Sequence, residues 1–175
     1  MDLFYFDKTL LAYERLCAWD NALSYLEMLY SEMDDQHILY SLIGFSWFYL
    51  IEGPVVSKKY SSDQNVMALS IWKKYIDIGV AEMSKDPFFN FIAGYTLSLH
   101  GYYINEEYEK KGHEFMVNCV ELSRNTLLYE LANNFLKNEH SGKYVPVNNG
   151  KEICLQLFNG DSLVDNYFNE IYSSK

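Results

Sequence analysis

The fold is decided by the stretch from Asp86 to Gly101, which reads DPFFNFIAGYTLSLHG. Asp86-Pro87 and Gly101 are residues at which helices commonly end, and the segment between them is strongly apolar. We therefore predict a helix over residues 87–102. Part of this helix repeats earlier in the chain, since residues 93–96 (Ala-Gly-Tyr-Thr) match residues 43–46 (Ile-Gly-Phe-Ser) at a shift of 50.

The repetition extends to the neighbouring helices. Residues 75–78 (Tyr-Ile-Asp-Ile) match residues 25–28 (Tyr-Leu-Glu-Met) at the same shift of 50. A third copy lies 39 residues after the second, with residues 121–125 aligned on residues 82–86. Apolar residues in the first two copies recur at three and four positions, which is the spacing of a helix. The repeating unit is therefore a pair of helices that occurs about three times.

Glycine, proline and turn-forming pairs divide the remaining chain into segments of helical length. We predict an all-α fold with eight or nine helices and essentially no sheet. Residues 53–62 are expected to form a loop, and Asp161-Ser162 is expected to cap the last helix. The expected helices span residues 3–17, 20–33, 36–52, 63–84, 87–102, 105–122, 125–138, 150–158 and 161–173.

The repeat resembles that of tetratricopeptide (TPR) proteins between about Trp19 and Asn138. In that family the first helix of a repeat carries a large residue followed by a small one, and a glycine closes the hairpin. Ala93-Gly94 with Gly101 is similar to this pattern. The spacings of 50 and 39 depart from the family's 34 residues, and Asn133 replaces the small residue in the third copy.

The resemblance implies TPR-like stacked helical hairpins, which form an α-α superhelix. A chain of 175 residues with 49% hydrophobic residues is long enough for one core. We therefore expect one domain over residues 1–175, with a TPR-like core over residues 19–138 and capping helices over residues 150–173. A plain helical bundle is the alternative.

A stack of TPR-like hairpins has a concave surface lined by the first helix of each repeat. The family's groove positions fall here on aromatic residues with a polar edge: Ser41, Phe45, Phe48, Phe91, Tyr95, Ser98, Glu130, Asn134 and Lys137. Aromatic anchors dominate the energetics of protein interfaces. We therefore predict that partner binding involves Phe45, Phe48, Phe91, Tyr95, Glu130 and Asn134. The alternative is that the aromatic residues pack between the helices.

The acidic character of the chain indicates the kind of partner. The formal net charge is −10 and the isoelectric point is about 4.8, which disfavours nucleic acid because phosphate binding needs clustered Lys and Arg. An acidic surface attracts basic proteins instead. Asp34-Asp35 precedes the helix expected near Gln36, so this pair is predicted to cap that helix or to bind a partner's Lys or Arg.

No motif for catalysis, metal binding or cofactor binding is recognisable. His113-Glu114 begins a zinc protease motif, but Val117 stands where its second histidine is needed. The three cysteines, Cys17, Cys119 and Cys154, are widely spaced in apolar surroundings, so we expect reduced core residues. We expect no enzyme activity, no metal and no cofactor. An enzyme with an unrecognised pair of carboxylates is the alternative.

In its small size, its acidity and its lack of catalytic motifs, the chain resembles the immunity proteins of bacterial toxin systems of the contact-dependent inhibition type. The resemblance implies a cytoplasmic protein that neutralises a basic toxin, such as a nuclease, by occluding its active site. A TPR-like adaptor or chaperone that binds an extended peptide is the second hypothesis. Pairing of two copies through the aromatic surface is a further alternative. No membrane span is expected, because the longest apolar stretch covers only residues 38–51.

Overall fold

A computed structural model of the chain describes residues 3–56, 61–141, 146–147 and 149–173. Within these ranges the chain contains nine α-helices, one short 3₁₀ helix (η1, Gly101–Tyr103) and no strand, which confirms the predicted all-α class. The helices are α1 (Lys8–Arg15), α2 (Trp19–Met33), α3 (Gln36–Val56), α4 (Ser62–Glu82), α5 (Pro87–His100), α6 (Glu106–Leu122), α7 (Leu127–Ser141), α8 (Gly150–Leu157) and α9 (Leu163–Ser173).

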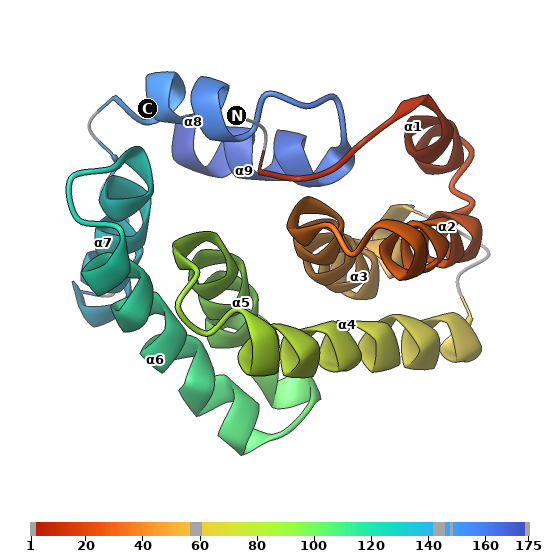
Figure 1. The fold of residues 1–175 in the computed structure, drawn as a ribbon, viewed down its shortest axis with the longest axis horizontal. Coiled ribbons are helices and arrows are strands. Elements are labelled where there is room, and N and C mark those ends of the chain that lie inside the picture. The colour runs from red at the N-terminus through yellow and green to blue at the C-terminus, as the bar shows by residue number, and fades with distance from the viewer. Residues whose placement is uncertain (1–2, 57–60, 142–145, 148, 174–175) are drawn as a thin grey trace.

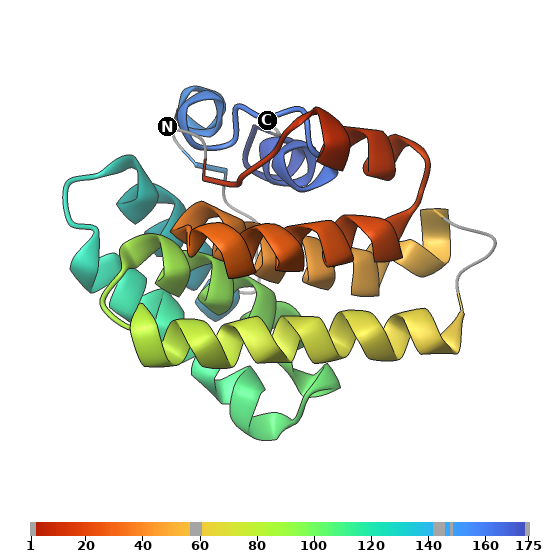
Figure 2. The same cartoon turned by 45° about the vertical axis from the view of Figure 1, so that its right-hand side comes forward.

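The helices form an inner row, an outer row and a covering layer. Helices α3, α5 and α7 contact one another in sequence order, while α4 packs on α3 and α6 packs on α5. Figure 1 shows α4 and α6 below the inner row and α1, α8 and α9 above it, with both chain ends in this upper layer. Figure 2 shows that the α2–α3, α4–α5 and α6–α7 turns all lie at one end of the molecule, on the left.

The first helix starts later than predicted. We expected a helix from residue 3, but α1 begins at Lys8 because the Asp7 side chain accepts a hydrogen bond from the backbone amide of Leu10 at 2.8 Å. Residues 3–7 run outside any helix, and the backbone N–H of Leu3 donates to the carbonyl of Leu157 at 2.9 Å. This segment therefore binds to the end of α8.

The third helix runs further than predicted. We expected a loop over residues 53–62, but α3 continues through Gly53 and Pro54 to Val56. Proline removes one helical hydrogen bond, and burial of α3 from Ile38 to Leu50 outweighs that loss because packing overrides local propensity. Part of the predicted loop, residues 57–60, lies outside the described residues.

Two capping arrangements define later helix starts. Ser61 and Gln64 form a reciprocal capping box at the start of α4. The predicted cap of the last helix is confirmed, because the Ser162 hydroxyl accepts from the backbone amide of Asp165 at 3.1 Å.

The cysteines depart in one position from the expectation. Cys119 and Cys154 are buried, whereas Cys17 is exposed. Cys17 lies in the turn between α1 and α2 with φ 52°, a conformation that directs the chain out of α1 and leaves the thiol at the surface. The expectation of three core cysteines was therefore wrong for this residue.

Candidate functional site

The predicted aromatic site residues lie in the core. Phe45, Phe48, Phe91 and Tyr95 are all at most 8% exposed. Phe45 and Phe48 come from α3, and Phe91 and Tyr95 come from α5. Their burial agrees with the alternative interpretation, in which the aromatic residues pack between helices, and leaves them no surface to offer a partner.

Helix α9 covers Phe48, Phe91 and Tyr95, whereas the ring of Phe45 packs on that of Trp19 in α2, with ring centroids 5.6 Å apart. The ring centroid of Phe168 lies 4.9 Å from the ring centroid of Tyr95 and 6.0 Å from that of Phe91. The ring of Tyr167 lies 6.0 Å from that of Phe48, and its hydroxyl lies 3.1 Å from the hydroxyl of Tyr95. The aromatic face of the inner row is thus occupied by the chain's own C-terminal helix.

The polar site residues have different locations. Asp34 ends α2 in the left-handed conformation, with φ 50°, and is exposed. Asp35 is half-buried, and its side chain accepts a hydrogen bond from the backbone amide of His37 at 2.7 Å. It therefore stabilises the start of α3, which is one of the two roles predicted for this pair. In α7, Glu130 is exposed and Asn134 is half-buried.

Asp34, Asp35 and Glu130 lie in or beside the turns that Figure 2 shows gathered at one end, and four further acidic residues lie in or beside the same turns. We call this set the acidic edge. Two exposed basic residues, Lys85 and Arg124, lie in the same turns, and no ion pair in the described ranges includes a carboxylate of the set. The acidic edge consists of Glu32, Asp34, Asp35, Glu82, Asp86, Glu121 and Glu130.

The electrostatic effect of this arrangement is visible at Tyr30. Its hydroxyl donates to Glu82 Oε2 at 3.4 Å. Burial raises the pKa of Tyr30 to about 12, and the charges of Glu82 and Asp34 add to the rise. Carboxylates from α4 and from the end of α2 therefore act on one hydroxyl and create a shared negative potential.

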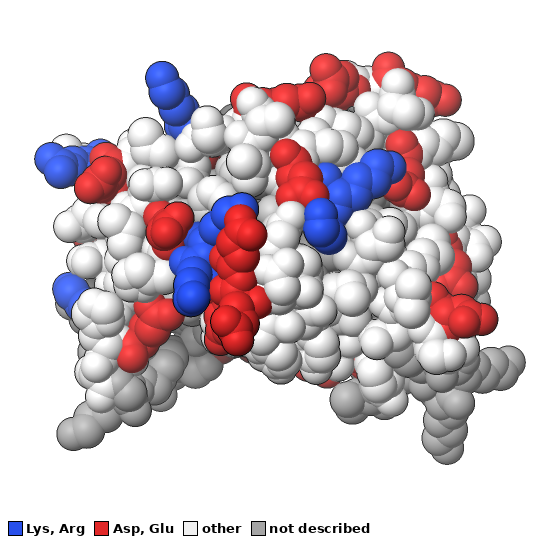
Figure 3. Space-filling model, turned by 90° about the horizontal axis from the view of Figure 1, so that it is seen from below, with Lys and Arg blue, Asp and Glu red and all other residues white. Residues whose placement is uncertain are grey.

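Charge is distributed differently on the face that α4 contributes. In Figure 3 the basic side chains near the centre lie against acidic ones, while acidic side chains gather along the upper right margin. An ion pair at 2.7 Å joins Lys74 of α4 to Glu27 of α2, and another at 2.6 Å joins Lys73 to Asp77. Neutralised pairs occupy this face, in contrast to the acidic edge.

Two open hollows meet at Glu130. One, of about 370 Å³, lies between α7 and α8 and is lined by Leu127, Glu130, Asn149, Glu152, Ile153 and Gln156. The other, of about 440 Å³, lies at the α6–α7 turn and is lined by Val120, Arg124, Asn125, Tyr129 and Glu130. Both could receive side chains of a bound protein.

The other residues that line these hollows were not predicted from the sequence. For two of them the residue type was a signal, because asparagine tolerates the left-handed conformation better than most residues. Asn125 and Asn149 adopt this conformation, with φ 67° and 60°. No sequence signal places Glu152 beside Glu130, since their proximity depends on how α8 packs against α7.

Exposed apolar side chains accompany the acidic edge. Met33, at the end of α2, is 57% exposed, and Leu122, at the end of α6, is 44% exposed. The exposed tyrosines of the described chain, Tyr102 and Tyr103, lie away from this edge, at the opposite end of α6. Their rings stack with centroids 4.6 Å apart. The acidic edge thus combines negative charge with apolar surface that a partner could bury.

The described residues contain no group of three His, Cys, Asp or Glu side chains placed to hold a metal ion. Within the same ranges, no helix combines the length and the apolar character needed to cross a membrane. The chain matches no protein-family model, no curated protein and no solved structure.

Proposed function

We propose that this protein binds a basic protein through the acidic edge, and that the partner is a toxin, such as a nuclease, whose active site it occludes. The observation that carries the proposal is the set of seven carboxylates at one end, five of them exposed and none in an ion pair with described residues, beside the two hollows at Glu130. This is the function of an immunity protein.

The mechanism follows from the charge and the shape of this end. A negative potential steers a basic protein toward the acidic edge and raises the association rate. On contact, Lys and Arg of the partner pair with carboxylates such as Asp34, Glu82 and Glu130. Met33 and Leu122 then lose contact with water, which favours the complex. A partner covered in this way has its own cationic active site blocked.

The alternative of an adaptor that binds an extended peptide has less support. Its binding surface would be the aromatic face of the inner row, and α9 covers that face through Tyr167 and Phe168. Pairing of two copies through the aromatic surface has less support for the same reason, because α9 covers Phe48, Phe91 and Tyr95.

The experiment is affinity purification from the native host at low and high salt, followed by mass spectrometry. The bait is compared with a variant of the acidic edge, Asp34→Asn/Glu82→Gln/Glu130→Gln. A matched control, Asp63→Asn/Glu106→Gln/Glu114→Gln, removes the same number of exposed charges elsewhere. We expect one basic protein in near-stoichiometric amount, retained by the control and lost or weakened with the edge variant.

Two outcomes would oppose the proposal. A partner that binds both variants equally would not use the acidic edge. Recovery of many weakly held proteins, or of none, would favour an adaptor or scaffold over an immunity protein.

A further inference from the structure

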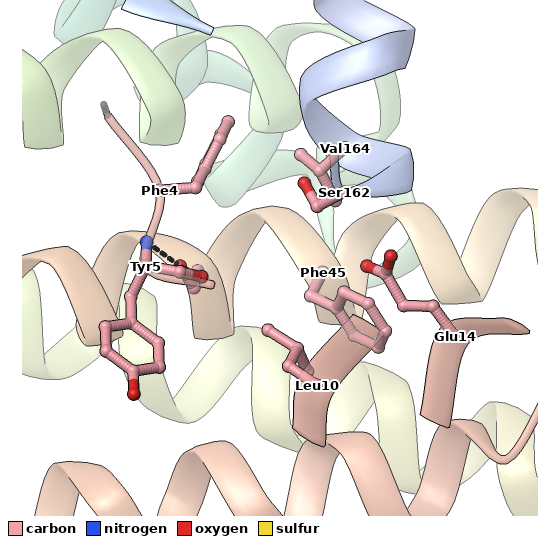
Figure 4. Close-up of a pocket in the computed structure, with 8 residues that line it drawn as sticks. Phe4, Tyr5, Leu10, Glu14, Phe45, Ser162 and Val164 are labelled. Atoms are coloured by element: carbon pink, nitrogen blue, oxygen red, sulfur yellow. Dashed lines mark hydrogen bonds between the residues drawn. The ribbon is translucent and has the colours of Figure 1, made fainter. Parts of the chain in front are cut away.

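A small cavity lies where α1, α3 and the N-terminal segment meet the start of α9. Its volume is about 10 Å³, which is enough for one water molecule. Figure 4 shows the carboxyl group of Glu14 extending from α1 toward Ser162 and Val164. The cavity is lined by Phe4, Tyr5, Leu10, Glu14, Ser41, Phe45, Ser162 and Val164.

Glu14 is buried although it is an acid. The residue is only 5% exposed to solvent. One carboxyl oxygen, Oε2, accepts from the backbone amide of Leu163, the first residue of α9, at 3.2 Å. The other, Oε1, is buried without a hydrogen-bond partner among the described residues. An ionised carboxylate is costly in such a place, whereas its protonated form loses less hydration.

The charged groups around Glu14 do not compensate for this burial. From α9 it faces Asp165, a fully buried acid whose Oδ2 accepts from the Ser162 hydroxyl at 2.6 Å. From its own helix it feels the positive charge of Arg15, but this effect is weaker than that of Asp165.

The remaining elements around the cavity add no positive charge. Helix α3 contributes Ser41 and Phe45, and the N-terminal segment contributes Tyr5. The hydroxyl of Tyr5 donates to Asp7 at 3.1 Å, and burial raises the pKa of this phenol to about 12, so it stays neutral. Glu14 therefore ionises in an environment that is apolar and, through Asp165, negative.

These surroundings place the proton equilibrium of Glu14 near neutral pH. Burial raises the pKa of the Glu14 carboxyl to about 7, and the charge of Asp165 adds to the rise. The hydrogen bond from Leu163 and the charge of Arg15 act in the opposite direction.

We propose that Glu14 is a proton switch, whose protonated form holds the α8–α9 hairpin against α1 and whose ionised form weakens that contact. The hairpin is the element affected because α8 and α9 pack on each other, and Leu163 at the start of α9 binds Glu14 directly. Ionised Glu14 gains hydration if α9 moves away, and that movement would uncover the aromatic residues of the inner row. This inference does not depend on the proposed partner.

The direction of the pH effect follows from the raised pKa. The folded protein binds this proton more tightly than the unfolded chain, so the stabilisation is complete below the ordinary pKa of glutamate, near 4.5. It is lost as pH rises through about 7. For these two pKa values, linkage makes the equilibrium constant for the closed hairpin, relative to an open form with a hydrated Glu14, about tenfold smaller at pH 8 than at pH 6.

The test combines a direct titration with a local measure of stability. NMR of ¹³C-labelled carboxyl groups follows Glu14 between pH 4 and 9, with the signal assigned by its loss in Glu14→Gln. Hydrogen exchange, corrected for intrinsic rates, follows amides of α9 with those of α4 as an internal reference. Glu114→Gln, at an exposed site on α6, is the matched control.

We expect Glu14 to titrate near pH 7 and α9 protection to fall about tenfold from pH 6 to pH 8. Glu14→Gln, permanently neutral, should keep its protection, and Glu114→Gln should behave like the unmodified chain. A Glu14 midpoint near 4.5 would overturn the proposal. So would a midpoint near 7 with no pH-dependent change in α9, because the proton would then not control the hairpin.

Discussion

At the residue scale, hydrogen bonds from tyrosine to carboxylates explain how so many aromatic rings can be buried. A buried ring contributes apolar area, and its hydroxyl needs a hydrogen-bond partner. Here acids from other helices or turns supply it. The pairs are Tyr25 with Asp7, Tyr30 with Glu82, Tyr40 with Asp86, Tyr49 with Asp20, Tyr75 with Glu27 and Tyr108 with Asp77. These acids therefore stabilise the fold, and Glu82 and Asp86 do so while belonging to the acidic edge.

Tyr40→Phe tests this role. The Tyr40 hydroxyl donates to Asp86 Oδ1 at 2.7 Å and links α3 to the start of α5. Its loss should lower the free energy of unfolding by about 1.5–3 kcal/mol, the range for a hydrogen bond to a charged group. Urea denaturation measures the change. Tyr13→Phe, at a tyrosine with no hydroxyl hydrogen bond to the described residues, should change it little.

At the element scale, glycines set the closeness of α5 and α6. A Cβ atom added at Gly94 would lie 2.8 Å from the backbone nitrogen of Met116, and one added at Gly112 would collide with the backbone of Ser98. The two helices therefore meet backbone to backbone, each with glycine at the contact. Neither helix can move away without exposing the buried residues of α5.

Gly112→Ala should destabilise the protein even though alanine favours helix by about 1 kcal/mol. The added methyl group meets rigid backbone, and overpacking of this kind costs about 1–3 kcal/mol or more. We expect a net loss in the free energy of unfolding in urea. Asn118→Ala, at an exposed position of α6, should be neutral or stabilising; if Gly112→Ala behaved the same way, the close contact would be refuted.

The packing of α9 on the inner row is a second contact between elements. Phe168 is fully buried and lies against Phe158 at 4.8 Å and Tyr95 at 4.9 Å. Phe168→Ala should therefore cost about 3–5 kcal/mol of unfolding free energy. Asn166→Ala, on the exposed side of α9, is the control. Equal effects of the two substitutions in urea denaturation would mean that α9 does not rest on the aromatic face.

At the scale of the whole molecule, the net charge of −10 is spread unevenly. Ion pairs neutralise part of the α4 face, whereas the acidic edge combines carboxylates from several turns. Like charges on a compact protein repel and lower its stability. The same repulsion is what a basic partner would relieve on binding.

The clustering can be tested without a partner. Salt screens exposed charges, so raising NaCl from low to moderate concentration should raise the melting temperature. Asp34→Asn/Glu82→Gln/Glu130→Gln should lose more of this salt effect than Asp63→Asn/Glu106→Gln/Glu114→Gln, although both change the net charge equally. Thermal denaturation at several salt concentrations decides; an identical salt response would mean that the edge has no special potential.

The sequence by itself determined the local structure. Turn residues and apolar spacing were enough to predict the all-α class, most helix boundaries and the Ser162 cap, because these depend on contacts within a few residues. The exceptions, at Lys8 and beyond Gly53, are places where a cap or burial overrides the apolar pattern. Exposure of Asp34 and Glu130 was also consistent with the sequence, since both are charged residues at the ends of helices.

Only the tertiary structure decided which element covers each apolar face. Gly44 and Gly94 are equivalent in the repeat, yet a Cβ at Gly44 would meet Phe4 and Val164, whereas one at Gly94 would meet α6. Three of the four aromatic residues predicted to bind a partner, Phe48, Phe91 and Tyr95, are instead covered by α9. Periodicity shows that a face must be buried, but hydrophobic burial has no direction, so it does not distinguish a partner from a distant part of the same chain.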